Sequence, residues 1–209
     1  MKRRTALKNL TLSLGYTVAT PTIFSMLASC NAKTETWTPL FLSSEEKHMV
    51  IHLTDIILPA TETLGALDVN VPQFLDLIYH DIEKISNQEL FKKGALAFAK
   101  AFFNTFDEEA IDGDKTSYEK LLSSYFNISD EDSKNILEQQ NLPIEEVNNT
   151  DMDNYAIYKF LFSVKSYTLF GYFTSEKVGE NILNYDPIPG SYIGCMPIKN
   201  SPNERAWSL

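Results

Sequence analysis

Two histidines and an aspartate are spaced so that they could bind a metal ion together. His48, His52 and Asp55 stand at positions i, i+4 and i+7. Residues three or four apart share one face of a helix, and imidazole and carboxylate groups are ordinary zinc ligands. A zinc peptidase also needs a glutamate after the first histidine to activate water, and no obvious further ligand stands nearby. The pattern therefore favours histidines on the polar side of an amphipathic helix, with a metal-dependent enzyme as the alternative.

The acidic segment 107–114 is the second place where the residue types suggest metal binding. A calcium loop needs oxygen ligands at alternating positions and a late bidentate glutamate. Glu119 departs from that spacing, which favours a solvated loop. Isolated glycines exclude a phosphate-binding loop, and the cysteine–histidine pattern of haem attachment is absent. The sequence therefore predicts no catalytic, cofactor-binding or metal-binding residue in this chain.

The first thirty residues indicate export and lipid attachment. Arg3 and Arg4, followed by a leucine and a lysine, resemble a twin-arginine export signal. A weakly apolar run over 10–28 ends in Leu-Ala-Ser before Cys30, which resembles the cleavage site of a bacterial lipoprotein. Its length would also suit a membrane span of roughly 30 Å, but Pro21 and many hydroxyl groups disfavour that alternative. We therefore predict a signal peptide over 1–29 and a lipid on Cys30.

Charge and composition describe one acidic, aromatic-rich domain. The formal net charge is −10, with 13 Phe and 10 Tyr in 209 residues. Loss of the four cations in 1–29 leaves −14 on the other 180 residues. Such a surface repels phosphate backbones, so we expect no nucleic-acid partner. Cys195 has no intramolecular partner if Cys30 carries lipid, which excludes a disulfide framework.

Helical periodicity and caps dominate the remainder, and no alternating strand pattern or repeat occurs. We predict a tether over 30–43 and, over 44–209, a single all-α domain of about six or seven helices with an irregular C-terminal tail. The expected helices are one from the Ser43–Glu46 capping box to Pro59, one from Pro72 with Phe74, Leu75, Ile78, Ile82 and Ile85 on its apolar face, one capped by Asn87 and reaching Phe106, one around Tyr118–Tyr125, one capped by Ser129, an aromatic helix over 151–173, and one from Ser175 to Leu183.

Two separated parts of this chain together resemble one family. The first includes the capping box, residues 55–66 (Asp-Ile-Ile-Leu-Pro-Ala-Thr-Glu-Thr-Leu-Gly-Ala) and residues 71–76 (Val-Pro-Gln-Phe-Leu-Asp). The second includes 171–175 (Gly-Tyr-Phe-Thr-Ser) and the tail 185–195. Both are similar to the gluconate 2-dehydrogenase subunit 3 family, whereas residues 87–150 match only in being helical.

The resemblance implies a small, non-catalytic partner of a periplasmic flavin-dependent sugar or polyol dehydrogenase. In such complexes a large subunit of the glucose–methanol–choline oxidoreductase type holds FAD, and electrons often pass to a cytochrome c subunit. The small subunit commonly carries the export signal for both, because the FAD-loaded subunit must cross the membrane folded. With the signals at Arg3, Arg4 and Cys30, this implies an escort and stabiliser anchored by lipid to a bacterial membrane.

On this interpretation the loop Pro59–Ala66 and the tail Tyr185–Pro197 face the partner. Both are irregular and rich in Pro, Gly and Tyr, and aromatic-rich patches favour interfaces. Each segment could equally pack on its own core with its glycines in turns, and the sequence leaves both alternatives open. The candidate interface residues are Pro59, Glu62, Thr63, Gly65, Ala66, Tyr185, Pro189, Gly190, Tyr192 and Gly194.

A free-standing periplasmic binding lipoprotein is the alternative function. It would bind a ligand such as a sugar on the aromatic face of the helix over 151–173. An escort expressed alone exposes its partner surface and aggregates. A binding lipoprotein stays monodisperse and gains melting temperature with its ligand.

Overall fold

The computed structural model describes residues 37–188, 190 and 195–208, and the chain divides into two units, Met1–Thr38 and Pro39–Leu209. Arg3, Arg4 and Cys30 lie outside the described residues. The described part of the second unit has seven α-helices and no β-strand, which confirms the predicted all-α domain. None of the described helices combines the length and apolar character needed to cross a bilayer.

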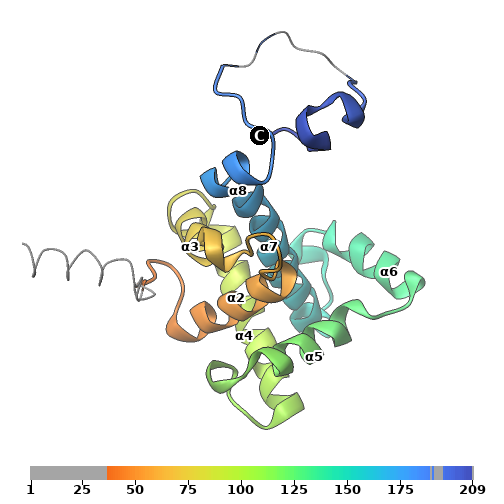
Figure 1. Cartoon of the computed structure of the whole chain (residues 1–209). Coiled ribbons are helices and arrows are strands. Elements are labelled where there is room, and N and C mark those ends of the chain that lie inside the picture. The colour runs from red at the N-terminus through yellow and green to blue at the C-terminus, as the bar shows by residue number, and fades with distance from the viewer. Residues whose placement is uncertain (1–36, 189, 191–194, 209) are drawn as a thin grey trace, which may run out of the picture. The chain divides into compact units, whose positions relative to one another are not determined.

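The helices follow one another along the chain with short 3-10 turns between some of them (Figure 1). They are α2 (Ser44–Ile57), α3 (Val71–Asp81), α4 (Ile85–Phe106), α5 (Lys115–Phe126), α6 (Asp130–Gln140), α7 (Met152–Phe173) and α8 (Glu176–Asn181). The 3-10 turns cover Leu67–Val69, Ala110–Asp112, Ile144–Glu146, Ile198–Asn200 and Pro202–Glu204.

Helices α4 and α7 form the centre of the domain, with α2, α3 and α5 packed around them (Figure 1). A Cβ on Gly94 would lie 2.2 Å from the carbonyl oxygen of Ala156 and 2.7 Å from the Cβ of Phe160. The missing side chain therefore lets the two helices approach closely. Phe91 and Phe98 then pack on Phe160 with ring centroids 4.9 and 5.7 Å apart.

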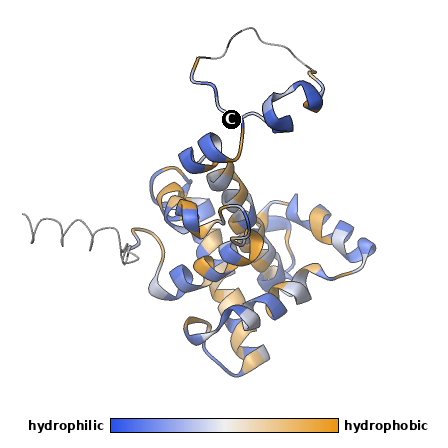
Figure 2. Cartoon of the chain, in the orientation of Figure 1, coloured by the Kyte–Doolittle hydropathy of each residue, from blue (hydrophilic) through white to orange (hydrophobic). Residues whose placement is uncertain are grey.

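Helix α7 carries apolar residues on most of its sides, and other elements of the domain cover most of its surface. The four consecutive residues Tyr155–Tyr158 are all buried, unlike those of an amphipathic surface helix. Buried Tyr155 donates a hydrogen bond to the carbonyl oxygen of Leu142 at 3.0 Å. Figure 2 shows hydrophobic colouring concentrated on the central helices and mostly hydrophilic colouring on α8. The aromatic helix predicted over 151–173 is thus the core of the fold.

Several helix boundaries follow the signals read from the sequence. The Ser43 hydroxyl accepts a hydrogen bond from the Glu46 N–H, and the Glu46 carboxylate accepts one from the Ser43 N–H, which completes the predicted capping box. Helix α2 ends just before Pro59. Ser129 caps α6 by accepting from the Asp132 N–H at 3.1 Å. The structure confirms these local signals: the two serines satisfy N–H groups that a helix start leaves open, and Pro59 cannot continue the helix.

The predicted connection between the second and third helices is wrong. Helix α3 ends at Asp81 and α4 begins at Ile85, so Ile82 and Ile85 do not extend the apolar face of α3. Their side chains are 71% and 72% exposed. Helical spacing continued through these residues by chance, whereas the N–H groups of Ile82 and Glu83 both donate to the Ile78 carbonyl and close the helix.

Two further boundaries differ from the predictions. Asn87 lies inside α4 and does not cap it, because its side chain donates to the Glu83 carboxylate at 2.6 Å and Lys84 occupies the cap position. Helix α8 ends at Asn181 and does not reach Leu183, since Leu183 packs on a buried apolar cluster next to the loop Pro59–Ala66.

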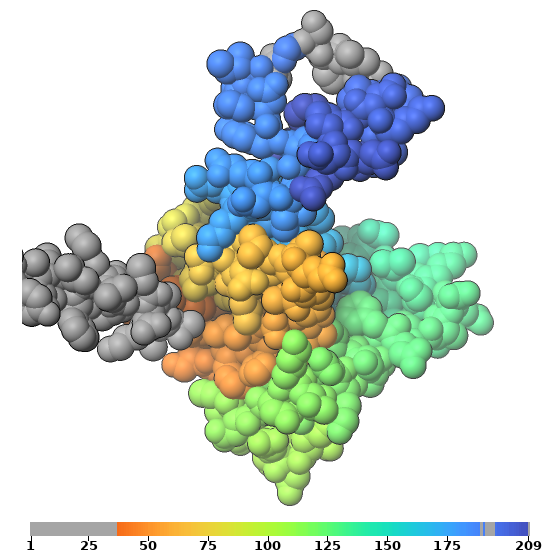
Figure 3. Space-filling view, viewed as in Figure 1, coloured from red at the N-terminus to blue at the C-terminus, as the bar shows by residue number. Residues whose placement is uncertain are grey.

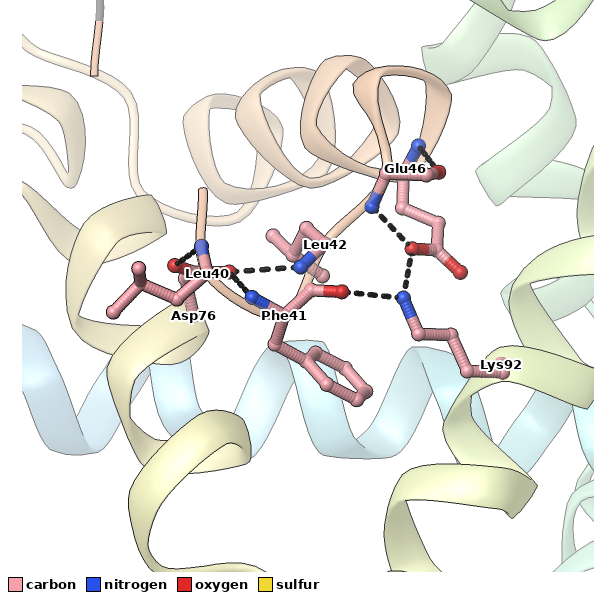
Figure 4. Close-up of polar contacts among 7 residues, drawn as sticks. Leu40, Phe41, Leu42, Glu46, Asp76 and Lys92 are labelled. Carbon is pink, nitrogen blue, oxygen red and sulfur yellow. Dashed lines mark hydrogen bonds and ion pairs between the residues drawn. The ribbon is translucent and has the colours of Figure 1, made fainter. Parts of the chain in front are cut away.

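Residues Leu40–Ser43, here called the strap, are bound by a buried carboxylate (Figure 4). Asp76 of α3 accepts hydrogen bonds from the N–H groups of Leu40 at 2.8 Å, Phe41 at 3.0 Å and Leu42 at 2.9 Å. The Asp76 side chain is fully buried. The three N–H donors therefore replace the hydrogen bonds to water that the carboxylate loses when it is buried.

Lys92 of α4 binds the strap as well (Figure 4). Its ammonium group donates to the Phe41 carbonyl at 2.6 Å and pairs with the Glu46 carboxylate in the first turn of α2. The Phe41 ring lies 4.0 Å from the Lys92 nitrogen and stacks on Tyr79 of α3 at 5.2 Å. The strap thus connects α2, α3 and α4, and the last residues of the predicted tether 30–43 belong to the folded domain.

We expect Asp76→Ala to lower the free energy of unfolding by about 2–4 kcal/mol, because it removes the acceptor from buried backbone N–H groups. Urea unfolding followed by circular dichroism measures the change. Asp81→Ala is the matched control: this carboxylate lies on the same helix, is exposed and, among the described residues, forms an ion pair only with His80, so we expect less than about 0.5 kcal/mol. Equal effects of the two substitutions would contradict the role given to Asp76.

Candidate functional site

His48 and His52 lie in a packed joint between α2 and α5. Their ring centroids are 4.5 Å apart, and the His52 ring stacks on Tyr118 at 5.0 Å with an interplanar angle of 11°. The Nε2 of His48 donates a hydrogen bond to the Gly113 carbonyl oxygen at 2.9 Å. Both histidines therefore contribute to the packing that places α5 against α2.

The acidic residues around the two histidines are also used within the fold. Asp55 lies 2.6 Å from the ammonium nitrogen of Lys115. Asp114, from the acidic segment, caps α5 by accepting from the Ser117 N–H at 2.8 Å. Over the part of the chain that the structure describes, no three His, Cys, Asp or Glu side chains are grouped so that they could hold a metal ion.

The environment of His52 favours its neutral form. Burial lowers the pKa of His52 from its ordinary value of 6.5, and the neighbouring His48 lowers it further. The carboxylates of Asp55 and Asp114 raise it but do not reverse the direction.

The C-terminal end of the loop Pro59–Ala66 is anchored to the core. The Ala66 N–H donates to the Leu58 carbonyl at 2.8 Å, which closes the loop on the end of α2. The Tyr172 hydroxyl of α7 donates to the Leu64 carbonyl at 2.8 Å. Ala66 is fully buried and belongs to an apolar cluster whose other buried members are Val71, Tyr172 and Val178.

Gly65 is required by the tight path of this loop. A Cβ at this position would lie 2.4 Å from the backbone nitrogen of Ala60 and 2.9 Å from the carbonyl carbon of Pro59. The Gly65 N–H donates to the Asp68 carboxylate at 2.8 Å, and the Asp68 carbonyl accepts from Lys177 of α8 at 2.9 Å. The loop is therefore bound to α8 as well as to α7.

The tip of the loop, Pro59–Thr63, is exposed beside an open hollow. Figure 3 shows the gold atoms of this region directly below the blue atoms of α8. Glu62 has no hydrogen bond or ion pair with any described residue. The hollow has a volume of about 660 Å³ and is lined by Ala60, Thr61, Glu62, Thr63, Leu64, Asp68, Asn181, Ile182 and Arg205.

The last described residues return to the end of α8. The Asn184 side-chain amide donates to the Ser201 hydroxyl at 2.8 Å and to the Arg205 carbonyl at 2.7 Å. The Arg205 guanidinium donates to the Asn181 carbonyl at 3.2 Å. These contacts explain how a residue near the C-terminus comes to line the same hollow as the loop tip.

Of the predicted tail residues, Tyr185 does not line the hollow beside the loop tip. Tyr185 is 55% exposed and lines a separate hollow of about 350 Å³ with Phe173 and residues of α8. Gly190 is exposed, and a Cβ there would meet nothing within 4 Å. Pro189, Tyr192 and Gly194 lie outside the described residues.

The structure divides the predicted loop residues into two groups. Gly65 and Ala66 are buried and hold the loop in place, whereas Pro59, Glu62 and Thr63 are exposed. Sequence reasoning did not identify Asn181 and Arg205 as neighbours of the tip. The available signal was that Arg205 is the only arginine outside the first four residues, and arginine is enriched at interfaces.

We expect Gly65→Ala to lower the free energy of unfolding by about 1–3 kcal/mol, because backbone atoms of the loop cannot move aside for the new Cβ. Gly190→Ala makes the same chemical change where space is open and is expected to have almost no effect. Urea unfolding of both variants measures the difference. An unchanged free energy of unfolding for Gly65→Ala would show that the loop can move aside for the new Cβ.

We expect the domain to lose stability as the pH falls below about 6.5, in part through His52. Its lowered folded-state pKa means that the unfolded chain binds this proton first. The loss of stability begins near the pKa of His52 in the unfolded chain and stops increasing below its pKa in the folded domain. His52→Phe keeps a ring on Tyr118 and removes the proton, so its free energy of unfolding should change less than that of wild type between pH 7 and 5. An unchanged pH dependence would contradict this role.

Comparison with known proteins identifies one family. Residues 44–190, well over half of the chain, match the family model described as gluconate 2-dehydrogenase subunit 3. The matched region contains the loop Pro59–Ala66 and all of α8, whereas Arg205 lies beyond it. Comparison with curated proteins and with solved structures gave no match. The chain therefore belongs to the gluconate 2-dehydrogenase subunit 3 family, whose members are subunits of dehydrogenase complexes.

Proposed function

We propose that this chain is a non-catalytic subunit that escorts and stabilises an FAD-dependent sugar or polyol dehydrogenase of the glucose–methanol–choline type. The observation that carries the proposal is the loop Pro59–Ala66, whose anchored base presents an exposed tip beside an open hollow. Family membership supports a dehydrogenase subunit as the partner. In this proposal the partner holds FAD, and a cytochrome c subunit accepts its electrons.

The anchored base of the loop suits a binding role. Contacts to Leu58, Tyr172 and Asp68 fix the loop before any partner arrives. A surface that is already ordered loses little conformational entropy on binding, so more of the contact energy appears as affinity. The same bonds explain why the loop can pack on its own core at one end and face a partner at the other.

The charges at the hollow favour a partner surface that carries basic and hydrogen-bonding groups. Glu62 is exposed and unpaired among the described residues. Arg205 uses one guanidinium nitrogen on the Asn181 carbonyl, and its other donors can bind a carboxylate or carbonyl of the partner. The net charge of −10 would speed association with a basic surface and discourage contact with other acidic proteins.

The remaining parts of the proposal rest on residue types near the N-terminus. Arg3 and Arg4 would direct export of the folded complex, and Cys30 would carry the lipid that anchors it on the periplasmic side of a bacterial membrane. A partner that supplies the signal solves a physical problem, because FAD must be bound before the large subunit crosses the membrane.

The alternative of a free-standing binding lipoprotein has less support. It would use the aromatic face of α7, but Tyr155 and Tyr158 are buried in the core, whereas Phe170 is half exposed. A sugar site needs several polar groups that converge on an accessible cavity. The hydroxyls of Tyr155 and Tyr158 instead donate to backbone carbonyls of the fold.

We expect Glu62→Lys to weaken association with the flavoprotein subunit about tenfold or more, because the charge of the loop tip is reversed. The assay is a pull-down of the tagged full chain from solubilised membranes, with flavin absorbance and mass identification of bound chains as readouts. Glu119→Lys is the matched control: this glutamate is exposed on α5 and lines none of the hollow, so its complex should form as in wild type.

Two results would contradict the proposal at different levels. A colourless wild-type protein with no stoichiometric oxidoreductase would overturn the escort function. A yellow complex that forms equally well with Glu62→Lys would keep the escort function and exclude the loop tip as its binding surface.

A further inference from the structure

An apolar groove lies where α2, α5 and α7 diverge, on a part of the molecule that the proposed function does not use. Helix α5 packs on α2 and α4, and α7 packs on α2, which leaves a gap next to the end of α2. The groove has a volume of about 360 Å³, at the lower end of the range for small-molecule sites. Its lining residues are Leu53, Ile57, Leu122, Ser123, Phe126, Leu161, Val164 and Lys165.

The lining residues divide into a dry floor and a polar edge. Leu53, Leu161 and Val164 are almost completely buried and belong to the core. Ser123 and Lys165 are exposed and are the only polar side chains in the lining. A sugar or a nucleotide would leave its polar groups unsatisfied on such a floor. The floor therefore selects a hydrocarbon ligand.

The single charge at the groove selects the head group of that ligand. Lys165 is the only charged residue in the lining, in a chain whose net charge is −10. Its ammonium group makes no hydrogen bond or ion pair with any described residue. The charge at the groove is thus positive, whereas the net charge of the chain is negative. An anionic group beside the groove can therefore pair with the Lys165 ammonium group.

We propose that this groove binds a single-chain fatty-acid carboxylate. The hydrocarbon tail lies against the accessible side chains of Ile57, Leu122 and Phe126, over the buried floor, and the carboxylate pairs with Lys165 at the open edge. The cationic edge and the lack of hydrogen-bonding groups on the floor complement the two parts of such a molecule.

The test is calorimetric titration of the full chain, purified without detergent, with dodecanoate below its micelle concentration. Dodecanol and dodecyltrimethylammonium share the tail and lack the negative charge. We expect dodecanoate to bind at least tenfold more tightly than dodecyltrimethylammonium, and affinity to rise from octanoate to dodecanoate by up to about fourfold per methylene. Absence of dodecanoate binding, or equal binding of the anionic and cationic amphiphiles, would overturn the proposal.

Two variants locate the site. Ser123→Trp fills the mouth from an exposed position and is expected to abolish binding while circular dichroism stays unchanged. Lys165→Glu should weaken dodecanoate at least tenfold and leave dodecanol within about twofold. Lys100→Glu is the matched control, because Lys100 is exposed on α4 and lies outside the groove. Binding that survives Ser123→Trp, or that responds equally to both lysine substitutions, would show that the ligand binds elsewhere.

Discussion

A carboxylate can be buried only where its oxygens accept enough hydrogen bonds to replace the water they lose. Asp76 meets this requirement with three successive backbone N–H groups of the strap Leu40–Ser43. The consequence reaches beyond one residue, because the same strap leads into the capping box of α2 (Figure 4) and carries Phe41 into a stack with Tyr79. Lys92 then connects strap and capping box to α4. The relative placement of α2, α3 and α4 thus depends on one buried acid.

Local signals in the sequence were sufficient for much of the fold. The Ser43–Glu46 box, Pro59 and Ser129 each act within one helical turn, and the structure confirms the boundaries that they predict. The break between α3 and α4 could not be predicted in the same way. Ile82 and Ile85 continue the helical spacing in sequence, but the Gln88 side chain donates to the Tyr79 carbonyl at 2.6 Å and so satisfies the end of α3 from the next helix. Such a contact depends on two helices already being placed.

The candidate site shows the same division between local and distant information. The glycine at position 65 was identifiable as a turn residue, although only the structure shows that Ala60 and Pro59 leave no room for a side chain. The neighbours of the loop tip could not be found from spacing, because Asn181 and Arg205 are more than a hundred residues away in sequence. The sequence indicated the loop and the tail as two candidate partner-facing segments and did not place them relative to each other. In the structure Tyr185 lines a different hollow, and Arg205 is the residue near the C-terminus that lines the hollow beside the loop tip.

The strap also has a mechanical consequence for the proposed function. In that proposal, the chain before Pro39 links an export signal and a lipid anchor to the domain. A pull along the chain then reaches the strap, whose N–H groups are bound to Asp76 and whose Phe41 carbonyl is bound to Lys92. Because these two side chains belong to α3 and to the central helix α4, the load passes to both helices and not to the first turn of α2 alone. A buried carboxylate with three backbone donors is therefore well suited to the point where a transported and anchored subunit is held.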